Sequence, residues 1–585
     1  IFRCSDGRMK KHLSRKAAGA DFAVGSFGHF LIWGICSSLS VTVCTIVDAL
    51  LVGNLTGSSG LAVANISTPV FLFYALIGMT VGIGANVGIA RLLGTADIKA
   101  ANRTFSAVLG LGLILSAAAL LPLLFKDAFF TFLGVTKELY PKADSYLTVV
   151  MYSAPAFIMY HILSASVRSD SDPVLAAIAS GTVIFVNIAL DIIFMQVLRL
   201  GIIGASASLC IAEALGVLVL LSHFFKKSSL LKLKIALPRK SDIKDFVSNG
   251  FGVGSSGFFG AVVMLAFNTL LLRFGASNGA LYVAIYGVLY TVGTVPGGIF
   301  EGISGALSTV TAFTAGESDI AGIFAVRKRA VLTALIVGGV ISLLFTAFPN
   351  TLVGFFGIKS TAAAASLRIF AISVVFTGIN TVLTAYWQSL GRAGAAGVIS
   401  LLRSCLLMPA LGAVLIPKSG ITGLALTYAL TEALCAAAVI IFSYTAAAEK
   451  YVTDKFGANG RCFESAYAIK TESTFSISAD LERICGEWNI APRHAFFINF
   501  ICEEMLLNII KFALSGGGKT YYISIMLMEK NGDYILRIRD NVSRYNPFES
   551  DGDEIDSGVL RLIKAKTKYC DYQRKMIFNY LYTVL

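Results

Sequence analysis

Residues 45–57, T-I-V-D-A-L-L-V-G-N-L-T-G, close an apolar run that begins near Phe27. The run is long enough to cross a bilayer, which takes about 20 residues. Inside it lies one carboxylate, Asp48. An acid near the centre of a membrane helix costs about 2.5–3.5 kcal/mol to insert, so it usually faces a partner or a watery cavity. Asp48 is therefore a candidate functional residue, the alternative being an acid near the helix end that simply meets water.

The composition predicts a polytopic membrane protein. The chain has 585 residues, of which 56% are hydrophobic and 14% charged, and its mean hydropathy is +0.75. The 55 glycines agree, because small residues let membrane helices approach closely. The ten cysteines are scattered with no C-x-x-C pair, which argues against a disulfide framework or a metal site. The net charge of +13 falls mostly in loops, so membrane lipids are expected partners and nucleic acid is not.

Twelve apolar spans can be counted. Loops rich in Lys and Arg alternate with loops of little net charge, and cytoplasmic loops of membrane proteins carry the excess of basic residues. Both termini are therefore predicted to be cytoplasmic, in a bacterial inner (plasma) membrane. The spans lie near residues 27–52, 60–90, 104–125, 145–167, 173–197, 202–225, 249–273, 279–312, 328–348, 364–388, 393–416 and 420–446.

An internal repeat divides these spans into two halves. A shift of 219 residues brings G-I-I-G-A-S-A-S-L-C-I-A-E (201–213) onto G-I-T-G-L-A-L-T-Y-A-L-T-E (420–432). Six spans per half is an even number, so both halves enter from the same side, and a substrate cavity is expected between them. Glu213 and Glu432 occupy equivalent places in both halves, and we interpret them as structural or cavity-facing.

The predicted fold is thus an all-α membrane part of twelve helices in two six-helix repeats, followed by a soluble α+β domain. The expected boundaries are a basic cytoplasmic segment (1–24), a first lobe (25–225), a cytoplasmic linker (226–245), a second lobe (246–448), a second linker (449–462) and a cytoplasmic domain (463–585).

The two lobes differ in their membrane carboxylates. At the repeat spacing, Asp48 corresponds to Phe267 and Asp191 corresponds to Ala410. Only the first lobe therefore keeps both acids, and we expect a cation or proton site there.

The expected site combines four side chains. Asn187 and Asp191 are four residues apart, on one face of a helix. Together with Asp48 and the hydroxyl of Ser208, they would supply hard oxygen ligands to a small cation, or acceptors to protons.

These features resemble the multidrug and toxic compound extrusion (MATE) family over about residues 25–448. The resemblance rests on V-D-A-L-L-V-G-N-L-T-G-S-S-G-L-A-V-A-N-I-S-T-P (47–69), N-I-A-L-D (187–191), G-I-I-G-A-S-A-S (201–208) and L-G-R-A-G (390–394). It implies two lobes that open alternately and export organic, drug-like cations in exchange for Na⁺ or H⁺. One subgroup of the family places the ion site on residues that correspond to Asp48, Asn187, Asp191 and Ser208, with Ser208 standing where Thr is expected.

The tail, residues 463–585, contains a helical stretch followed by alternating strand-like runs such as Y-Y-I-S-I-M-L-M (521–528) and Y-I-L-R-I-R-D (534–540). Three segments of the tail resemble the ATP-binding domain shared by histidine kinases, gyrase, Hsp90 and the bacterial anti-sigma-factor kinases. They are E-E-M-L-L-N-I-I-K-F-A (503–513), R-D-N-V-S-R-Y-N-P-F (539–548) and D-S-G-V-L-R-L-I-K (556–564), the last followed by Y-C-D-Y-Q-R-K-M-I-F-N-Y-L (569–581). An ordinary amphipathic helix is the alternative for residues 503–513.

The resemblance assigns roles to four residues of the tail. Asn508 would hold Mg²⁺, Glu504 would act as the base, and Asp540 would recognise adenine. Gly558 alone remains of the usual double-glycine phosphate loop, and Val542 stands where a glycine is expected, so the domain is a degenerate version of the fold.

Three functions remain open on these patterns. The first is a secondary antiporter coupled to Na⁺ or H⁺, with a regulatory tail that takes ATP and Mg²⁺ and contacts a cytoplasmic protein. The second is a membrane-anchored signalling protein whose tail is a kinase or partner-binding module. The third is a flippase for lipid-linked molecules. An ATP-powered pump is disfavoured because no G-x-x-x-x-G-K-[ST] loop occurs, and whether the tail retains ATPase or kinase activity stays open.

Overall fold

The computed structural model places most of the chain. Within its helices, the side chains of residues 6–21, 41, 44–46, 48–50, 52–62, 65, 252–258, 261, 280, 393 and 511–514 are not described. The described residues are 6–133, 135, 140–226, 229–275, 278–356, 360–457, 461–469, 473–514, 521–530, 532–543, 562–576 and 578–585.

The chain divides into two compact units. The larger comprises Phe27–Gly316 and Arg327–Tyr451. The smaller combines three separate segments, Ile1–Ser26, Glu317–Val326 and Val452–Leu585. The tail thus shares a unit with a short segment that the sequence assigns to the second lobe.

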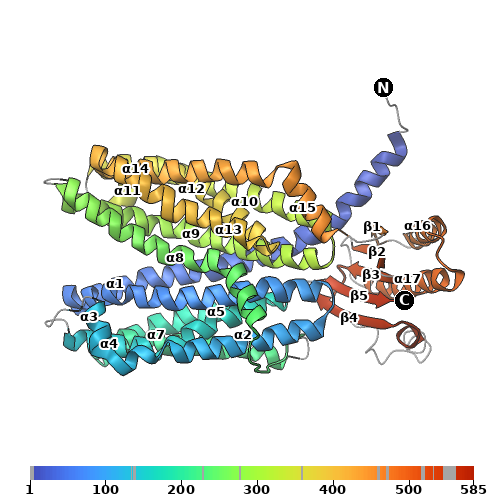
Figure 1. Ribbon diagram of the computed structural model, residues 1–585, viewed down its shortest axis with the longest axis horizontal. Coiled ribbons are helices and arrows are strands. Elements are labelled where there is room, and N and C mark those ends of the chain that lie inside the picture. The colour runs from blue at the N-terminus through green and yellow to red at the C-terminus, as the bar shows by residue number, and fades with distance from the viewer. Residues whose placement is uncertain are drawn as a thin grey trace. The chain divides into compact units, whose positions relative to one another are not determined.

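The larger unit is helical, and Figure 1 shows its helices running side by side in two layers, one formed by the first half of the chain and one by the second. The α-helices of the first layer are α1 (Asp6–Gly94), α2 (Ile98–Ala118), α3 (Lys126–Phe132), α4 (Tyr140–Tyr152), α5 (Ala154–Ser169), α6 (Pro173–Asp191) and α7 (Ile202–Ser222). Those of the second are α8 (Lys240–Phe274), α9 (Gly279–Gly316), α10 (Ile320–Ala347), α11 (Pro349–Gly354), α12 (Thr361–Ser389), α13 (Ala393–Leu401) and α14 (Met408–Ser443), with α15 (Ala446–Phe456) following.

Ten stretches of the described residues are long and apolar enough to cross a membrane, so the predicted count of twelve is not confirmed. Gly394–Ser443 forms one stretch where the sequence predicts two. The seventh predicted span lies within α8, where the side chains of residues 252–258 and 261 are outside the described part of the chain. The chain is an integral membrane protein with a helical membrane part.

Helix α1 contains two candidate spans, Phe22–Ser40 and Ile66–Gly94. Gly34 lies against Gly302 of α9, and Arg91 lies against Gly316 at the end of α9. At 1.5 Å per residue, a straight helix would hold Gly34 and Arg91 about 85 Å apart, whereas Gly302 and Gly316 are only about 21 Å apart along α9. The two apolar stretches of α1 therefore do not lie on one straight axis.

Glycines let the two layers touch backbone to backbone. A Cβ added to Gly84 of α1 would lie 1.9 Å from the Phe246 carbonyl oxygen of α8, and one added to Gly250 would lie 1.8 Å from the carbonyl oxygen of Thr80. A side chain fits at neither place, so these glycines set how closely α1 and α8 approach.

The internal repeat has a local structural counterpart. Gly201 and Gly420, which the 219-residue shift superposes, have φ angles of 62° and 56°. Positive φ is a conformation that glycine adopts at little cost. In the second lobe, this residue interrupts α14 with a non-helical conformation.

The smaller unit contains a five-stranded antiparallel sheet in the order β1-β2-β3-β5-β4. Its strands are β1 (Cys462–Ala468), β2 (Tyr522–Lys530), β3 (Asp533–Asp540), β4 (Tyr569–Lys575) and β5 (Phe578–Val584). Helices α16 (Ser473–Glu487) and α17 (Pro492–Leu514) share one apolar core with the sheet, which includes Ile498 and Met505 of α17 and Ile525 and Leu536 of the strands. A small sheet domain therefore follows the membrane part.

Candidate ion-coupling and nucleotide-binding sites

Three of the four residues predicted for ion coupling meet between α6 and α7. The side chains of Asn187, Asp191 and Ser208 are fully buried. Ser208 Oγ donates to Asp191 Oδ1, and Asn187 Nδ2 donates to Ser208 Oγ at 3.4 Å. Ser208 Oγ also lies 2.8 Å from the Ala205 carbonyl oxygen, which is the other acceptor open to its single proton. The cluster holds a carboxylate, an amide oxygen and a hydroxyl, which are ligands for a hard cation.

The fourth predicted residue, Asp48, lies on α1, and its side chain is outside the described residues. Its contribution to the cluster stays a prediction.

The backbone changes its winding directly after the carboxylate. Asp191 is the last residue of α6, and Ile192–Val197 continue as a π-helix, η2. Single π-helical turns inside membrane helices are frequent at functional sites because they turn side chains out of the regular register. The end of α6 is therefore shaped locally around Asp191.

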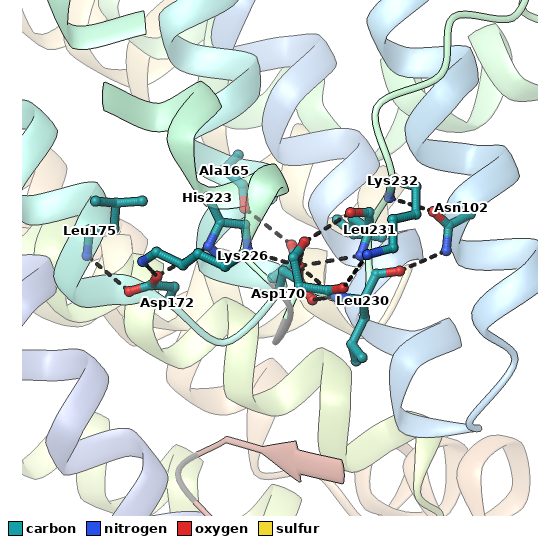
Figure 2. Close-up of polar contacts among 12 residues, drawn as sticks. Asn102, Ala165, Asp170, Asp172, Leu175, His223, Lys226, Leu230, Leu231 and Lys232 are labelled. Carbon is teal, nitrogen blue, oxygen red and sulfur yellow. Dashed lines mark hydrogen bonds and ion pairs between the residues drawn. The ribbon is translucent and has the colours of Figure 1, made fainter. Parts of the chain in front are cut away.

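A polar network fixes the opposite end of α6, as Figure 2 shows. The Asp172 side chain accepts from the Leu175 amide and caps the helix, and Pro173 follows at the first helical position. Both ring nitrogens of His223, at the end of α7, face carboxylates: Nε2 lies 2.8 Å from Asp170 and Nδ1 lies 3.1 Å from Asp172. These contacts tie α6 to α7, the two helices that form the site.

Asp170 and Asp172 also hold the segment that leaves α7. The Leu230 and Leu231 amides donate to Asp170, and Lys226 Nζ lies 2.7 Å from Asp172 (Figure 2). Burial alone would raise the pKa of Asp172, but hydrogen bonds from His223 and Lys226 hold it well below its ordinary value. Asp172 therefore stays ionised near neutral pH.

The second lobe uses its membrane carboxylate differently. Glu432 of α14 is buried and lies 2.6 Å from Arg403 of the π-helix η5 (Leu402–Leu407). Asn380 Nδ2 of α12 donates to Glu432 Oε2 at 2.7 Å. Glu432 is thus the partner of Arg403 in a buried ion pair. Its equivalent Glu213 is also buried, and its Oε2 has no hydrogen-bond partner among the described residues.

An aromatic cluster occupies the place in the second lobe that corresponds to Asp48. Phe267 is fully buried, and its ring centroid lies 6.2 Å from that of Tyr286 and 6.3 Å from that of Tyr428. The two tyrosine hydroxyls are 3.0 Å apart. A Cβ on Gly412 would lie 2.3 Å from the Phe267 ring, so this ring packs directly on the α14 backbone.

In the tail, the residues predicted for nucleotide binding fall on two elements. Glu504 and Asn508 lie one turn apart on α17, where Asn508 Nδ2 donates to the Glu504 carbonyl oxygen at 2.9 Å. Asp540 ends β3 and is buried. Gly558 lies outside the described residues. Burial raises the pKa of Asp540 to about 6, against hydrogen bonds from Asn579 and the Val542 amide that favour its charged form.

Sequence reasoning missed two features of the tail. Asn579 of β5 is paired with Asp540 in the sheet and donates to its Oδ1 at 2.8 Å. Arg537 and Arg539 of β3 are 2% and 4% exposed. The two arginines are two residues apart in Y-I-L-R-I-R-D, so they lie on one face of the strand. This spacing is the pattern from which a charged strand face could have been predicted.

Comparison with known proteins gives the context of the membrane part. Residues 35–193 match the MatE family model. The multidrug export protein MepA of Staphylococcus saprophyticus is 25% identical over 422 residues, covering 71% of this chain and 92% of that protein. MepA of Staphylococcus aureus is 26% identical over 428 residues, with the same two shares covered.

Solved structures agree on the fold. An outward-facing multidrug resistance MATE family transporter of the MOP superfamily superposes with a TM-score of 0.68 at 19% identity, covering 74% of this chain and 96% of that chain. A MOP superfamily transporter from Pyrococcus furiosus superposes with a TM-score of 0.67 at 19% identity, covering 75% and 98%. The membrane part of this chain therefore has the fold of the MATE transporters.

Proposed function

We propose, from a membrane part that has the MATE fold and matches the MatE family model, that this chain is a secondary antiporter of a bacterial plasma membrane. It exports small organic, drug-like compounds, cations above all, in exchange for Na⁺ or H⁺ by alternating access. The relatives that are named as multidrug export proteins support this substrate class. Both termini lie in the cytoplasm in this proposal, as the basic loops predict.

The observation that carries the proposal is the buried cluster of Asn187, Asp191 and Ser208. A carboxylate in a membrane span with polar groups gathered on it marks an ion or proton pathway by default. One charge that crosses 100 mV supplies about 2.3 kcal/mol, enough for a roughly fortyfold gradient of a neutral load.

The second lobe supports the assignment of Asp48 to the same site. Phe267, which corresponds to Asp48, lies against Gly412, two residues after Ala410, which corresponds to Asp191. If the repeats are built alike, Asp48 approaches the end of α6 beside Asp191, and the site then holds two carboxylates.

For the tail, we propose a regulatory domain related to the histidine kinase and gyrase ATP-binding fold. In this proposal, Asn508 on α17 would hold Mg²⁺, Glu504 on the same helix would act as the base, and the buried Asp540 at the end of β3 would recognise adenine. A protein partner in the cytoplasm remains part of this proposal, as does ATP with Mg²⁺ as the ligand.

The test is substrate-dependent Na⁺ and H⁺ flux in proteoliposomes, with and without ATP. The variants are Asp48→Asn and Asp191→Asn in the full chain, and Asp144→Asn is the matched control because Asp144 lies at a half-exposed position near the start of α4. The account predicts that both membrane variants lose coupled flux and that the control keeps it.

Coupled flux that survives both substitutions would contradict the antiporter. If wild-type protein carries no flux but its output to a cytoplasmic protein depends on Glu504 and Asn508, the signalling alternative holds. Movement of a lipid-linked substrate without dependence on soluble cations would identify a flippase.

A further inference from the structure

The sheet of the smaller unit has a second buried face that its own helices do not cover. Leu536 and Ile538 of β3 point into the core shared with α16 and α17. Side chains alternate along a strand, so Arg537 and Arg539 project from the opposite face. Both arginines are nevertheless almost fully buried.

What covers these arginines is the connection between α9 and α10. Glu317 Oε2 lies 2.9 Å from Arg539 and 3.6 Å from Arg537, and the Glu317 carbonyl oxygen accepts from Arg537 at 3.2 Å. Asp319 Oδ2 lies 3.6 Å from Arg539. From the sheet itself, Glu464 Oε1 accepts from both arginines at 2.8 Å. The cluster is built from three carboxylates and two guanidinium groups.

The start of α1 occupies the same face. The Phe22 and Phe578 rings meet edge to face with their centroids 4.8 Å apart, and the Arg539 guanidinium lies 5.3 Å from the Phe22 ring centroid. Ser26 Oγ donates to the Met576 carbonyl oxygen at 2.9 Å. A cation on an aromatic face and a pair of rings both add to the apolar burial.

The two segments also touch each other, because a Cβ on Gly322 would lie 3.0 Å from the Ala23 Cβ. By the repeat, α1 belongs to the first lobe, whereas α9 and α10 belong to the second. One segment of each lobe is therefore bound on the same face of the sheet.

We infer that this face of the tail, defined by Glu464, Arg537, Arg539 and Phe578, is an intramolecular lock that holds one segment of each lobe together. Four of these charged residues, Glu317, Asp319, Arg537 and Arg539, are buried, which is tolerable only while each meets its partner. If the α9–α10 connection separates from the sheet, Arg537 and Arg539 lose the carboxylates of Glu317 and Asp319. Glu464 alone then faces the two guanidinium groups. A movement that separates the start of α1 from this connection must break the network, so the tail opposes that movement. The consequence for transport rests on the proposed function.

The test measures amide hydrogen exchange of the full chain in nanodiscs. The variants are Glu317→Lys in the connection, Arg539→Glu in the sheet, and both together, with Glu482→Lys at an exposed site on α16 as the matched control. We expect each single reversal to speed exchange of peptides covering 317–326 and β3 by at least about tenfold, because opening of this contact becomes easier. The double reversal restores part of the protection, and the control changes nothing.

Exchange at residues 317–326 that is the same in wild type and Glu317→Lys would overturn the docking. If Arg539→Glu fails to fold, Glu317→Gln still tests the docking, because it leaves the sequence of the sheet unchanged. It must also speed amide exchange at residues 317–326. The lock predicts in addition that Glu317→Gln changes the export rate by more than about twofold. Faster exchange with an unchanged export rate would overturn the lock. A chain that exports nothing at all fails the proposed function, while exchange still reports on the docking.

Discussion

The first lobe gathers acidic and polar side chains where the second lobe gathers aromatic rings. Asn187, Asp191 and Ser208 are buried together between α6 and α7, where the Ser208 hydroxyl donates to Asp191. In the second lobe, Phe267 packs on Gly412, and the buried Glu432 is held by Arg403 and Asn380.

This difference shows how the two halves of a duplicated helix bundle can use their buried carboxylates for different purposes. A membrane carboxylate that is paired with a protein cation has its charge balanced permanently and stabilises packing. A membrane carboxylate gathered with a hydroxyl and an amide, as Asp191 is, can exchange a mobile cation or a proton in our proposal. In our proposal, the first half of the fold holds an ion site and the second half holds the fixed ion pair of Arg403 and Glu432.

The largest effect is expected where the fixed pair is broken. Arg403→Ala leaves Glu432 buried without its cation, which should cost about 3–5 kcal/mol of stability. Thermal unfolding of purified protein in detergent measures the loss. Arg403→Met combined with Glu432→Leu should recover most of it, because the pair is then replaced by apolar groups of similar size. A stable Arg403→Ala variant would show that the pair does not hold the lobe.

The next largest effect is expected in the proposed ion site of the first lobe. Ser208→Ala removes the hydroxyl that donates to Asp191, and the loss of such a supporting contact should weaken ion binding by about tenfold to a hundredfold. The concentration of Na⁺, or the pH, at which export is half-maximal reports the change. Ser208→Thr keeps the hydroxyl and is the matched control. Equal behaviour of the two variants would remove Ser208 from the site.

A smaller effect is expected in the aromatic cluster. Phe267→Leu keeps the position apolar but leaves the contacts with Gly412, Tyr286 and Tyr428 imperfect. The cost should be about 1 kcal/mol, as for other apolar replacements of similar size. The unfolding midpoint should fall slightly while the ion dependence of export stays unchanged. A shift in ion dependence would mean that the second lobe takes part in coupling.

The smallest effect concerns the tail. Burial and the neighbouring Glu464 raise the pKa of Asp319 to about 6, above its ordinary value of 3.8. Between these two pKa values, Asp319 is protonated when the α9–α10 connection is docked on the sheet and ionised when the connection is undocked. This contribution to stability is full below about pH 4 and is lost as the pH rises through about 6. The charged groups that face Asp319 are Glu317, Glu464, Arg537 and Arg539.

Docking should accordingly be tighter at about pH 5 than at about pH 7.5. Asp319→Asn keeps the cluster neutral at both values and should flatten this dependence. Thermal unfolding at the two pH values, followed by exchange protection of residues 317–326, measures it. An unchanged pH dependence in Asp319→Asn would assign the titration to another group.

Much of the membrane part could be predicted from the sequence, because its physical signals are local. Long apolar runs predict spans, and the acids at Asp48 and Asp191 stand out against them. The repeat placed Gly201 and Gly420 at equivalent positions, and both have positive φ. The count of twelve spans is not confirmed, because Gly394–Ser443 is one apolar stretch, although the division that the sequence predicts near residue 420 coincides with the non-helical Gly420.

The tail was harder to predict, because its burial depends on contacts between residues far apart in the chain. Arg539 and Glu317 are separated by 222 positions, and neither alone differs from an ordinary surface charge. The pairing of Asp540 with Asn579 follows from the strand register, which short alternating runs do not determine. The nucleotide-binding role of the tail stays a proposal.

The most direct test of the division between the lobes compares Asp191→Asn with Glu432→Gln in the same proteoliposome assay of ion-coupled export. Our account predicts that Asp191→Asn abolishes the dependence of export on the Na⁺ or H⁺ gradient. Glu432→Gln should keep that dependence, at whatever level of folded protein remains. Loss of ion dependence in Glu432→Gln together with its retention in Asp191→Asn would contradict the account.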